Sequence, residues 1–153
     1  MRMKKKSARR RVAPRRLLRF EFTCPSDPKK IGGIEQFLQR MNRRMRFDDG
    51  TMYRLLVATT EAVNNAMIHG NKLDPSKLVV VTILVSERLM RIRVKDEGMG
   101  FDPATIPNPL DENNLLKESG RGVFLTRSLM DDVQFVRLKH GWVVELRVNL
   151  RRT

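Results

Sequence analysis

The sequence predicts an α+β fold, with helices packed on one face of a mainly antiparallel sheet. Segments with helical spacing of apolar residues come early in the chain, and segments with strand-like alternation lie around them, joined by hairpin-length connections. The chain has 153 residues, of which 41% are hydrophobic and 31% charged, as in an ordinary globular protein. This length suffices for one core but not for two. We therefore expect a single two-layer domain.

The predicted domain begins with a strand and a helix. Residues 18–22 alternate between apolar and charged side chains, which is typical of a strand with one buried face. Ser26 or Asp27 can cap a helix that has Pro28 at its first position and runs through Met41 at helical spacing.

A second helix and a strand pair follow. Asp48 or Asp49 can cap the helix, whose apolar residues repeat at helical intervals until it ends near Gly70. Residues 78–85 are rich in β-branched side chains and predict a buried strand, and residues 91–95 alternate strictly. A short turn should join these two strands.

The last third of the chain predicts a long loop, a helix and two strands. Residues 98–120 contain three prolines and almost no periodicity, and loops of this length within a domain are often functional lids. Helical spacing returns at residues 123–129, and strands are predicted around residues 133–138 and 142–148.

The net charge of +14 is concentrated at the N-terminus. We expect residues 1–17 to form a basic, flexible arm and residues 18–153 to form the folded domain, which is only mildly basic. The arm could touch nucleic-acid phosphates or an anionic membrane surface, or be a solvated extension, and these alternatives stay open.

The sequence predicts a cytoplasmic protein. Its longest apolar stretch, residues 78–85, is far shorter than the roughly 20 residues that a membrane helix needs, and no apolar signal segment follows the basic arm. Cys24 is the only cysteine, so it cannot form an internal disulfide, and it cannot build a zinc site with His69 and His140.

Three groups of polar residues and glycines could carry chemistry. Glu61 and Asn65 lie four residues apart on one helical face, although taken alone they fit a solvent-exposed face better. Asp96 ends a buried strand and is followed by Gly98 and Gly100, which allow close approach of a ligand or form a simple turn.

The third group, Gly120-Arg121-Gly122, opens the last helix, where backbone N–H groups attract phosphate. The phosphate-loop, zinc-protease and esterase motifs G-x-x-x-x-G-K-[ST], H-E-x-x-H and G-x-S-x-G are all absent from the sequence.

In this order and spacing, residues 61–70, Asp96-x-Gly98-x-Gly100 and Gly120-x-Gly122 resemble the three ATP-site motifs of the GHKL ATPase superfamily. The His69-Gly70 ending and residues 120–133 are most similar to the anti-sigma factor serine/threonine kinases. The resemblance covers about residues 18–150 and implies a Bergerat-type ATP-binding fold, a histidine-kinase-like ATPase domain.

The resemblance also implies ATP and Mg²⁺ as ligands and gives the residues roles. Glu61 would be the general base, and Asn65 the Mg²⁺ ligand. Asp96 would accept a hydrogen bond from the adenine amino group, and the glycines would let the chain pass close to base and phosphates. Arg121 adds a cationic contact or points to solvent. The nucleotide-binding residues would be Asn65, Asp96, Gly98, Gly100, Gly120, Arg121 and Gly122.

Two residues do not fit this pattern fully. Many GHKL proteins have Gly-Thr where this chain has Gly141-Trp142, so a hydroxyl near the adenine is missing. Either Trp142 fills core volume, the interpretation we favour, or the adenine end of the pocket is altered. His69 precedes a helix-ending glycine and is expected to cap the helix or to interact with its dipole rather than to catalyse.

The resemblance implies a kinase that phosphorylates a serine or threonine of an anti-anti-sigma partner and also sequesters a sigma factor. A non-catalytic ATP-binding switch is the alternative, and Glu61 argues against it. A nucleic-acid-binding module driven by the arm is a third class. Homodimerisation is left open. A complete sensor histidine kinase is excluded, because His69 and His140 both lie inside the ATP-binding region.

Overall fold

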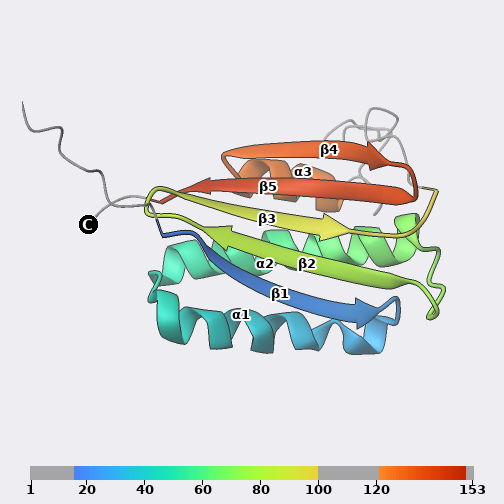
Figure 1. Cartoon of the computed structure of the whole chain (residues 1–153), viewed down its shortest axis with the longest axis horizontal. Helices are drawn as coiled ribbons and strands as arrows, with labels where there is room; N and C mark the ends of the chain where they lie inside the picture. The colour runs from blue at the N-terminus through green and yellow to red at the C-terminus, as the bar shows by residue number, and fades with distance from the viewer. Residues whose placement is uncertain (1–15, 100–120, 151–153) are drawn as a thin grey trace, which may run out of the picture.

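The computed structural model describes residues 16–99 and 121–150 (Figure 1). Within these residues, helices cover one face of an antiparallel sheet with strand order β1-β2-β3-β5-β4, which confirms the predicted α+β fold. The strands are β1 (Leu18–Pro25), β2 (Leu78–Val85), β3 (Leu89–Lys95), β4 (Asp132–Leu138) and β5 (Gly141–Asn149). The helical segments are η1 (Pro28–Lys30), α1 (Gly32–Met45), α2 (Asp49–Asn65), η2 (Ala66–Gly70) and α3 (Arg121–Leu129).

Two sequence predictions concern segments that are largely outside the described residues. These are the basic arm before Arg16 and the loop from Gly100 to Gly120. Among the described residues, no helix combines the length and the apolar composition that crossing a membrane requires.

The first predicted helix is divided in two. Asp27 caps the 3-10 turn η1 by accepting a hydrogen bond from the Lys29 N–H at 3.0 Å, and α1 begins only at Gly32. The break falls at Ile31, and Gly32 and Gly33 form the first two residues of α1. Ser26 is buried and is not the cap, since its hydroxyl donates to the Lys77 carbonyl at 2.8 Å.

Helix α2 starts and ends as its sequence signals predict. Asp48 is the N-cap, and its carboxylate accepts the Thr51 N–H at 2.7 Å. The chain continues from α2 into the π-helical turn η2, which ends at Gly70. The two segments together carry the chain along the whole length of the sheet (Figure 1).

The core lies between the helices and the inner face of the sheet. Cross-strand neighbours such as Val81 and Val94, or Ile92 and Leu146, point to this face in register. Helices α1 and α2 contribute Ile34, Leu38, Leu55 and Val63, all fully buried.

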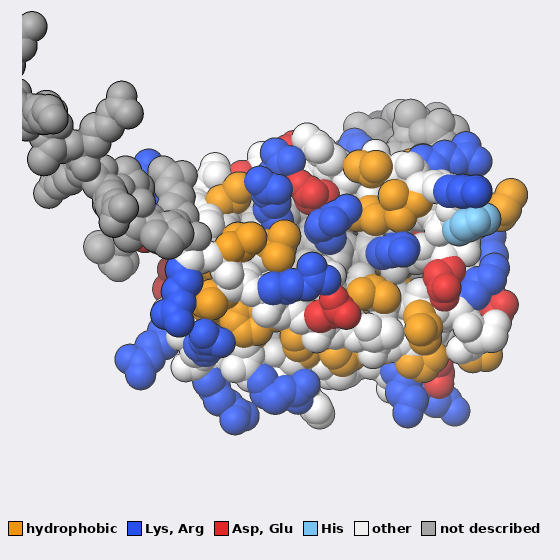
Figure 2. Space-filling view, in the orientation of Figure 1, with side chains coloured by type: hydrophobic (Ala, Val, Ile, Leu, Met, Phe, Trp, Pro, Cys, Tyr) orange, Lys and Arg blue, Asp and Glu red, His pale blue; other side chains and the backbone are white. Residues whose placement is uncertain are grey.

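The outer face of the sheet faces solvent and carries mixed charges (Figure 2). Several of its cations have acidic neighbours: Arg19 contacts Glu21 at 2.7 Å, and Arg147 contacts Glu145 at 2.8 Å. The uncovered face therefore mixes charged with apolar side chains such as Val136, whereas the main core cluster lies on the helix side.

One buried polar group in α2 lacks a partner. The Thr59 side chain is fully buried, and its hydroxyl makes no hydrogen bond within the described part of the chain. An unsatisfied buried hydroxyl carries its full desolvation cost.

Replacing this hydroxyl with a methyl group should stabilise the fold. We expect Thr59→Val, which keeps the side-chain shape, to raise the free energy of unfolding by about 1–3 kcal/mol, the cost of an unsatisfied buried group. Denaturant unfolding measures this change. Thr60→Val is the matched control, because Thr60 is only partly buried, and it should change stability by less than about 0.5 kcal/mol. A destabilised Thr59→Val variant would contradict this account.

Candidate functional site

Glu61 and Asn65 lie on the side of α2 that faces α3. Helices α2 and α3 run antiparallel (Figure 1), and Arg54, early in α2, donates from Nε to the carbonyl of Leu129 at the end of α3, at 2.6 Å. Glu61 and Asn65 follow Arg54 by seven and eleven residues, which at 3.6 residues per turn places them within about 20° of it around the helix axis. The three side chains therefore form one row along α2.

The first turn of α3 lies level with this carboxylate and amide. Arg121 lies about 12 Å from Leu129 along the axis of α3. The same distance along α2, measured from Arg54, ends between Glu61 and Asn65. Both side chains are half-buried, and neither has a hydrogen bond or ion pair with another described residue. A free carboxylate and a free amide thus lie beside a helix N-terminus, the end that attracts phosphate.

Asp96 is buried at the end of β3, and its exposed fraction is 4%. Its Oδ1 accepts the N–H groups of Gly98 at 3.0 Å and Trp142 at 3.2 Å. Burial raises the pKa of the Asp96 carboxyl above its usual value, and these two N–H groups and the charge of Lys77 offset part of the rise.

Two glycines bring the end of η2 against this carboxylate. A Cβ atom on Gly70 would lie 2.4 Å from Asp96 Oδ2, and one on Gly98 would lie 1.6 Å from the Gly70 carbonyl oxygen. Any other residue at either position would push the two segments apart. Gly98, which the sequence analysis assigned to contact with the base, here makes its close approach to Gly70. Asp96 Oδ2 receives no hydrogen bond from the described residues, so it remains available as an acceptor.

Asn71 was missed by the sequence analysis. Its buried amide donates to Ser26 Oγ at 2.7 Å and to the Leu78 carbonyl at 3.1 Å, and its Oδ1 accepts the Glu97 N–H at 2.8 Å. It therefore ties the end of the helix layer to the loop that carries Asp96. The only local signal was an asparagine just after a helix-ending glycine, which ordinarily indicates a turn.

The other residues that the sequence singled out are found at the following places. Arg121 and Gly122 begin α3, whereas Gly100 and Gly120 lie outside the described residues. His69 lies in η2, and burial, with the charge of Lys72, lowers its pKa.

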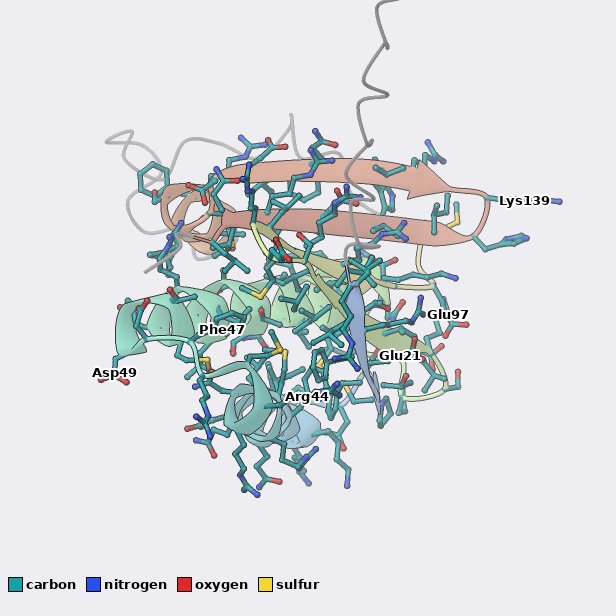
Figure 3. The ribbon with its side chains drawn as sticks, turned by 60° about the vertical axis from the view of Figure 1, so that its left-hand side comes forward. Glu21, Arg44, Phe47, Asp49, Glu97 and Lys139 are labelled. Atoms are coloured by element: carbon teal, nitrogen blue, oxygen red, sulfur yellow. The ribbon has the colours of Figure 1, made fainter. Side chains whose placement is uncertain are left out.

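The site lies at one end of the domain. Glu97, next to Asp96, and Lys139, in the β4–β5 turn, lie at this end, and Asp49, at the start of α2, lies at the other (Figure 3). No group of three or more His, Cys, Asp or Glu side chains that could hold a metal occurs in residues 16–99 and 121–150.

Comparisons with known proteins identify relatives of this chain. A serine-protein kinase RsbW from Bacillus licheniformis is 30% identical over 141 residues, which cover 86% of each chain. RsbW from Bacillus subtilis is 31% identical over 123 residues, covering 74% of this chain and 75% of the relative.

A solved structure of the RsbU and RsbW domains of a Mycobacterium tuberculosis protein has the same fold. It superposes with a TM-score of 0.65 at 16% identity, over 89% of this chain and 33% of the longer solved chain. The model of the histidine kinase-like ATPase domain matches residues 24–148, which include α2, Asp96 and α3. The chain therefore belongs to the histidine kinase-like ATPase domain family, with distant homology to the RsbW serine-protein kinases.

Proposed function

We propose that this protein binds Mg-ATP and transfers its γ-phosphoryl group to a serine or threonine of an anti-anti-sigma partner, and that it also sequesters a sigma factor. The family implies ATP binding, and the relatives' name, serine-protein kinase, supports a protein hydroxyl as the acceptor. The observation that carries the proposal is the free Glu61 carboxylate beside the start of α3.

In the proposed reaction, the acceptor hydroxyl attacks the γ-phosphorus of ATP. A new phosphorus–oxygen bond forms to the acceptor, the bond to the bridging β–γ oxygen breaks, and ADP leaves. Glu61 takes the hydroxyl proton. The N–H groups at the start of α3 stabilise the phosphate charge, so positioning and electrostatics supply most of the catalysis.

The residues at the site fit the nucleotide and its metal. The free Asp96 Oδ2 can accept a hydrogen bond from the adenine amino group, and the Asn65 amide oxygen is a hard ligand suited to Mg²⁺. Bound Mg²⁺ would neutralise part of the phosphate charge. Glu97, the nearest alternative base in the sequence, lies on the loop beside Asp96, where its carboxylate accepts the Leu78 N–H, and not in the row along α2.

A non-catalytic switch, which binds ATP and a partner without phosphoryl transfer, is the alternative. Such a switch would need Asp96 as the hydrogen-bond acceptor for the base, but it would not need the free carboxylate of Glu61 beside the phosphates.

Glu61→Gln should separate binding from turnover. The amide keeps the shape of the side chain but cannot take the proton, so we expect phosphoryl transfer to fall by roughly 10²–10⁴-fold. ATP affinity should stay close to that of the wild type. Radiolabelled ATP with a purified anti-anti-sigma candidate measures transfer, and calorimetry measures binding.

Glu35→Gln is the control, because Glu35 is exposed on α1 and should not affect transfer. Transfer by Glu61→Gln at the wild-type rate would show that Glu61 is not the base. A wild-type protein that binds ATP and a sigma factor but phosphorylates no cognate candidate would leave only the switch.

Asn65→Ala should remove the metal-dependent part of ATP binding. In calorimetry we expect the variant to bind ATP equally with Mg²⁺ and with a chelator, whereas the wild type should bind more tightly with Mg²⁺. Asn64→Ala is the matched control, since Asn64 lies about 100° around the helix from Asn65. A wild type that shows no preference for Mg²⁺, or an unchanged Asn65→Ala, would refute the assignment.

Asp96→Asn should weaken ATP binding and stabilise the fold at neutral pH. An amide can present an N–H to the adenine amino group, which should cost about 1–3 kcal/mol of binding. Asp49→Asn, at the far end of α2, is the binding control (Figure 3). Unchanged ATP affinity of Asp96→Asn would remove the adenine role.

The stability effect of Asp96→Asn follows from its raised pKa. Because folding raises the pKa of this carboxyl above 3.8, the folded state binds its proton more tightly than the unfolded state does. Wild-type stability therefore falls as pH rises from 3.8 through the folded pKa, and the variant lacks this loss. Denaturant unfolding between pH 4 and 7 should show the variant's advantage growing with pH, and an advantage that shrinks with pH would contradict the shift.

A further inference from the structure

Trp142 is the only tryptophan of the chain, and it lies directly opposite Asp96. The Asp96 N–H donates to the Trp142 carbonyl at 3.0 Å, and the Trp142 N–H donates to Asp96 Oδ1 at 3.2 Å. These bonds continue the β3–β5 pairing by one residue, since Lys95 pairs with Val143. The two residues therefore share one position at the end of the sheet.

Both side chains point to the helix side of the sheet. Side chains alternate along a strand, so Trp142 shares the face of Val144 and Leu146, and Asp96 shares the face of Val94. Contact between Asp96 and Gly70 is consistent with this direction. The three valine and leucine residues are buried in the core, but Trp142 is only half-buried and does not belong to it. The expectation that Trp142 fills core volume is therefore wrong, because the helix layer ends at Gly70.

The indole ring is held in place by the loop beside it. Its Nε1–H donates to the Met99 carbonyl at 3.2 Å. Gly141, just before it, has φ of +110°, and a Cβ there would lie 1.9 Å from the Asp96 carbonyl oxygen. The Met99 side chain is 85% exposed and so packs little against its neighbours. The ring is thus fixed at its edge by the loop and by its own backbone.

We propose that the indole of Trp142 forms an aromatic wall of the base pocket and packs against the adenine that Asp96 recognises. This inference rests on the proposed binding of ATP. A flat purine gains contact and stacking energy from an aromatic side chain, and a ring already held by its hydrogen bond loses little freedom when the base binds. Trp142 is then a determinant of base recognition, while phosphate recognition lies at α2 and α3.

Intrinsic fluorescence tests the contact directly, because Trp142 is the only source of tryptophan emission in this chain. Adenosine and Mg-ADP should change its emission and protect it from acrylamide quenching, whereas Mg-tripolyphosphate, which has no base, should leave both unchanged. Calorimetry on the same samples measures binding independently of the fluorophore. An equal response to tripolyphosphate would overturn the base contact.

The outcomes separate this inference from the proposed function. If calorimetry detects Mg-ADP binding but emission and quenching do not change, the Trp142 wall is refuted and nucleotide binding stands. If calorimetry detects no binding, both fail.

Two variants test how much the ring contributes. Trp142→Phe keeps an aromatic face and loses the bond to Met99, so it should bind Mg-ADP within a few-fold of the wild type. Trp142→Leu keeps apolar volume without an aromatic face and should bind roughly 5- to 100-fold more weakly. Denaturant unfolding checks that both variants fold. Equal affinity of the Leu variant and the wild type would show that the ring does not contact the base.

Discussion

The arrangement of the site depends on one buried carboxylate. Asp96 is placed at the junction of β3, β5 and the end of η2, where its Oδ1 is satisfied by two backbone N–H groups and its Oδ2 faces Gly70. Burying a charge is costly unless hydrogen bonds compensate, and the raised pKa of Asp96 shows that here the compensation is incomplete. A buried carboxylate with one oxygen unbonded among the described residues is a candidate for contact with a ligand.

The site also depends on the row of side chains along α2, which consists of Arg54, Glu61 and Asn65. The bond from Arg54 to the Leu129 carbonyl shows which side of α2 faces α3, and Glu61 and Asn65 lie on that same side. The buried residues Leu55 and Val63 fix this rotation of α2 from the sheet side. Core packing therefore decides which way the two free polar groups point, so a change far from the site can misdirect them.

Sequence patterns correctly predicted the features that depend only on neighbouring residues. Strand alternation, the Asp48 cap and the end of a helix at Gly70 each depend on a few neighbouring residues, and the structure contains them. The role of Asn71 was not predictable, because its partners Ser26, Leu78 and Glu97 come together only in the folded chain. The surroundings of Trp142 depend likewise on where the helix layer ends. A strand pattern predicts the face of a side chain but not what covers that face.

The two ends of the proposed nucleotide would be recognised in different ways. At the base end, Asn71 and the contact between Gly70 and Gly98 hold the Asp96 loop before any ligand arrives, so recognition there requires little ordering. At the phosphate end, Glu61 and Asn65 have no protein partners among the described residues, so a ligand can engage them without breaking bonds within that part of the chain. A base end organised in advance can hold the nucleotide while the groups at the phosphate end adjust to it. In this proposal Asp96 and its neighbours recognise the base, Asn65 adds the metal-dependent part of the affinity, and Glu61 serves turnover.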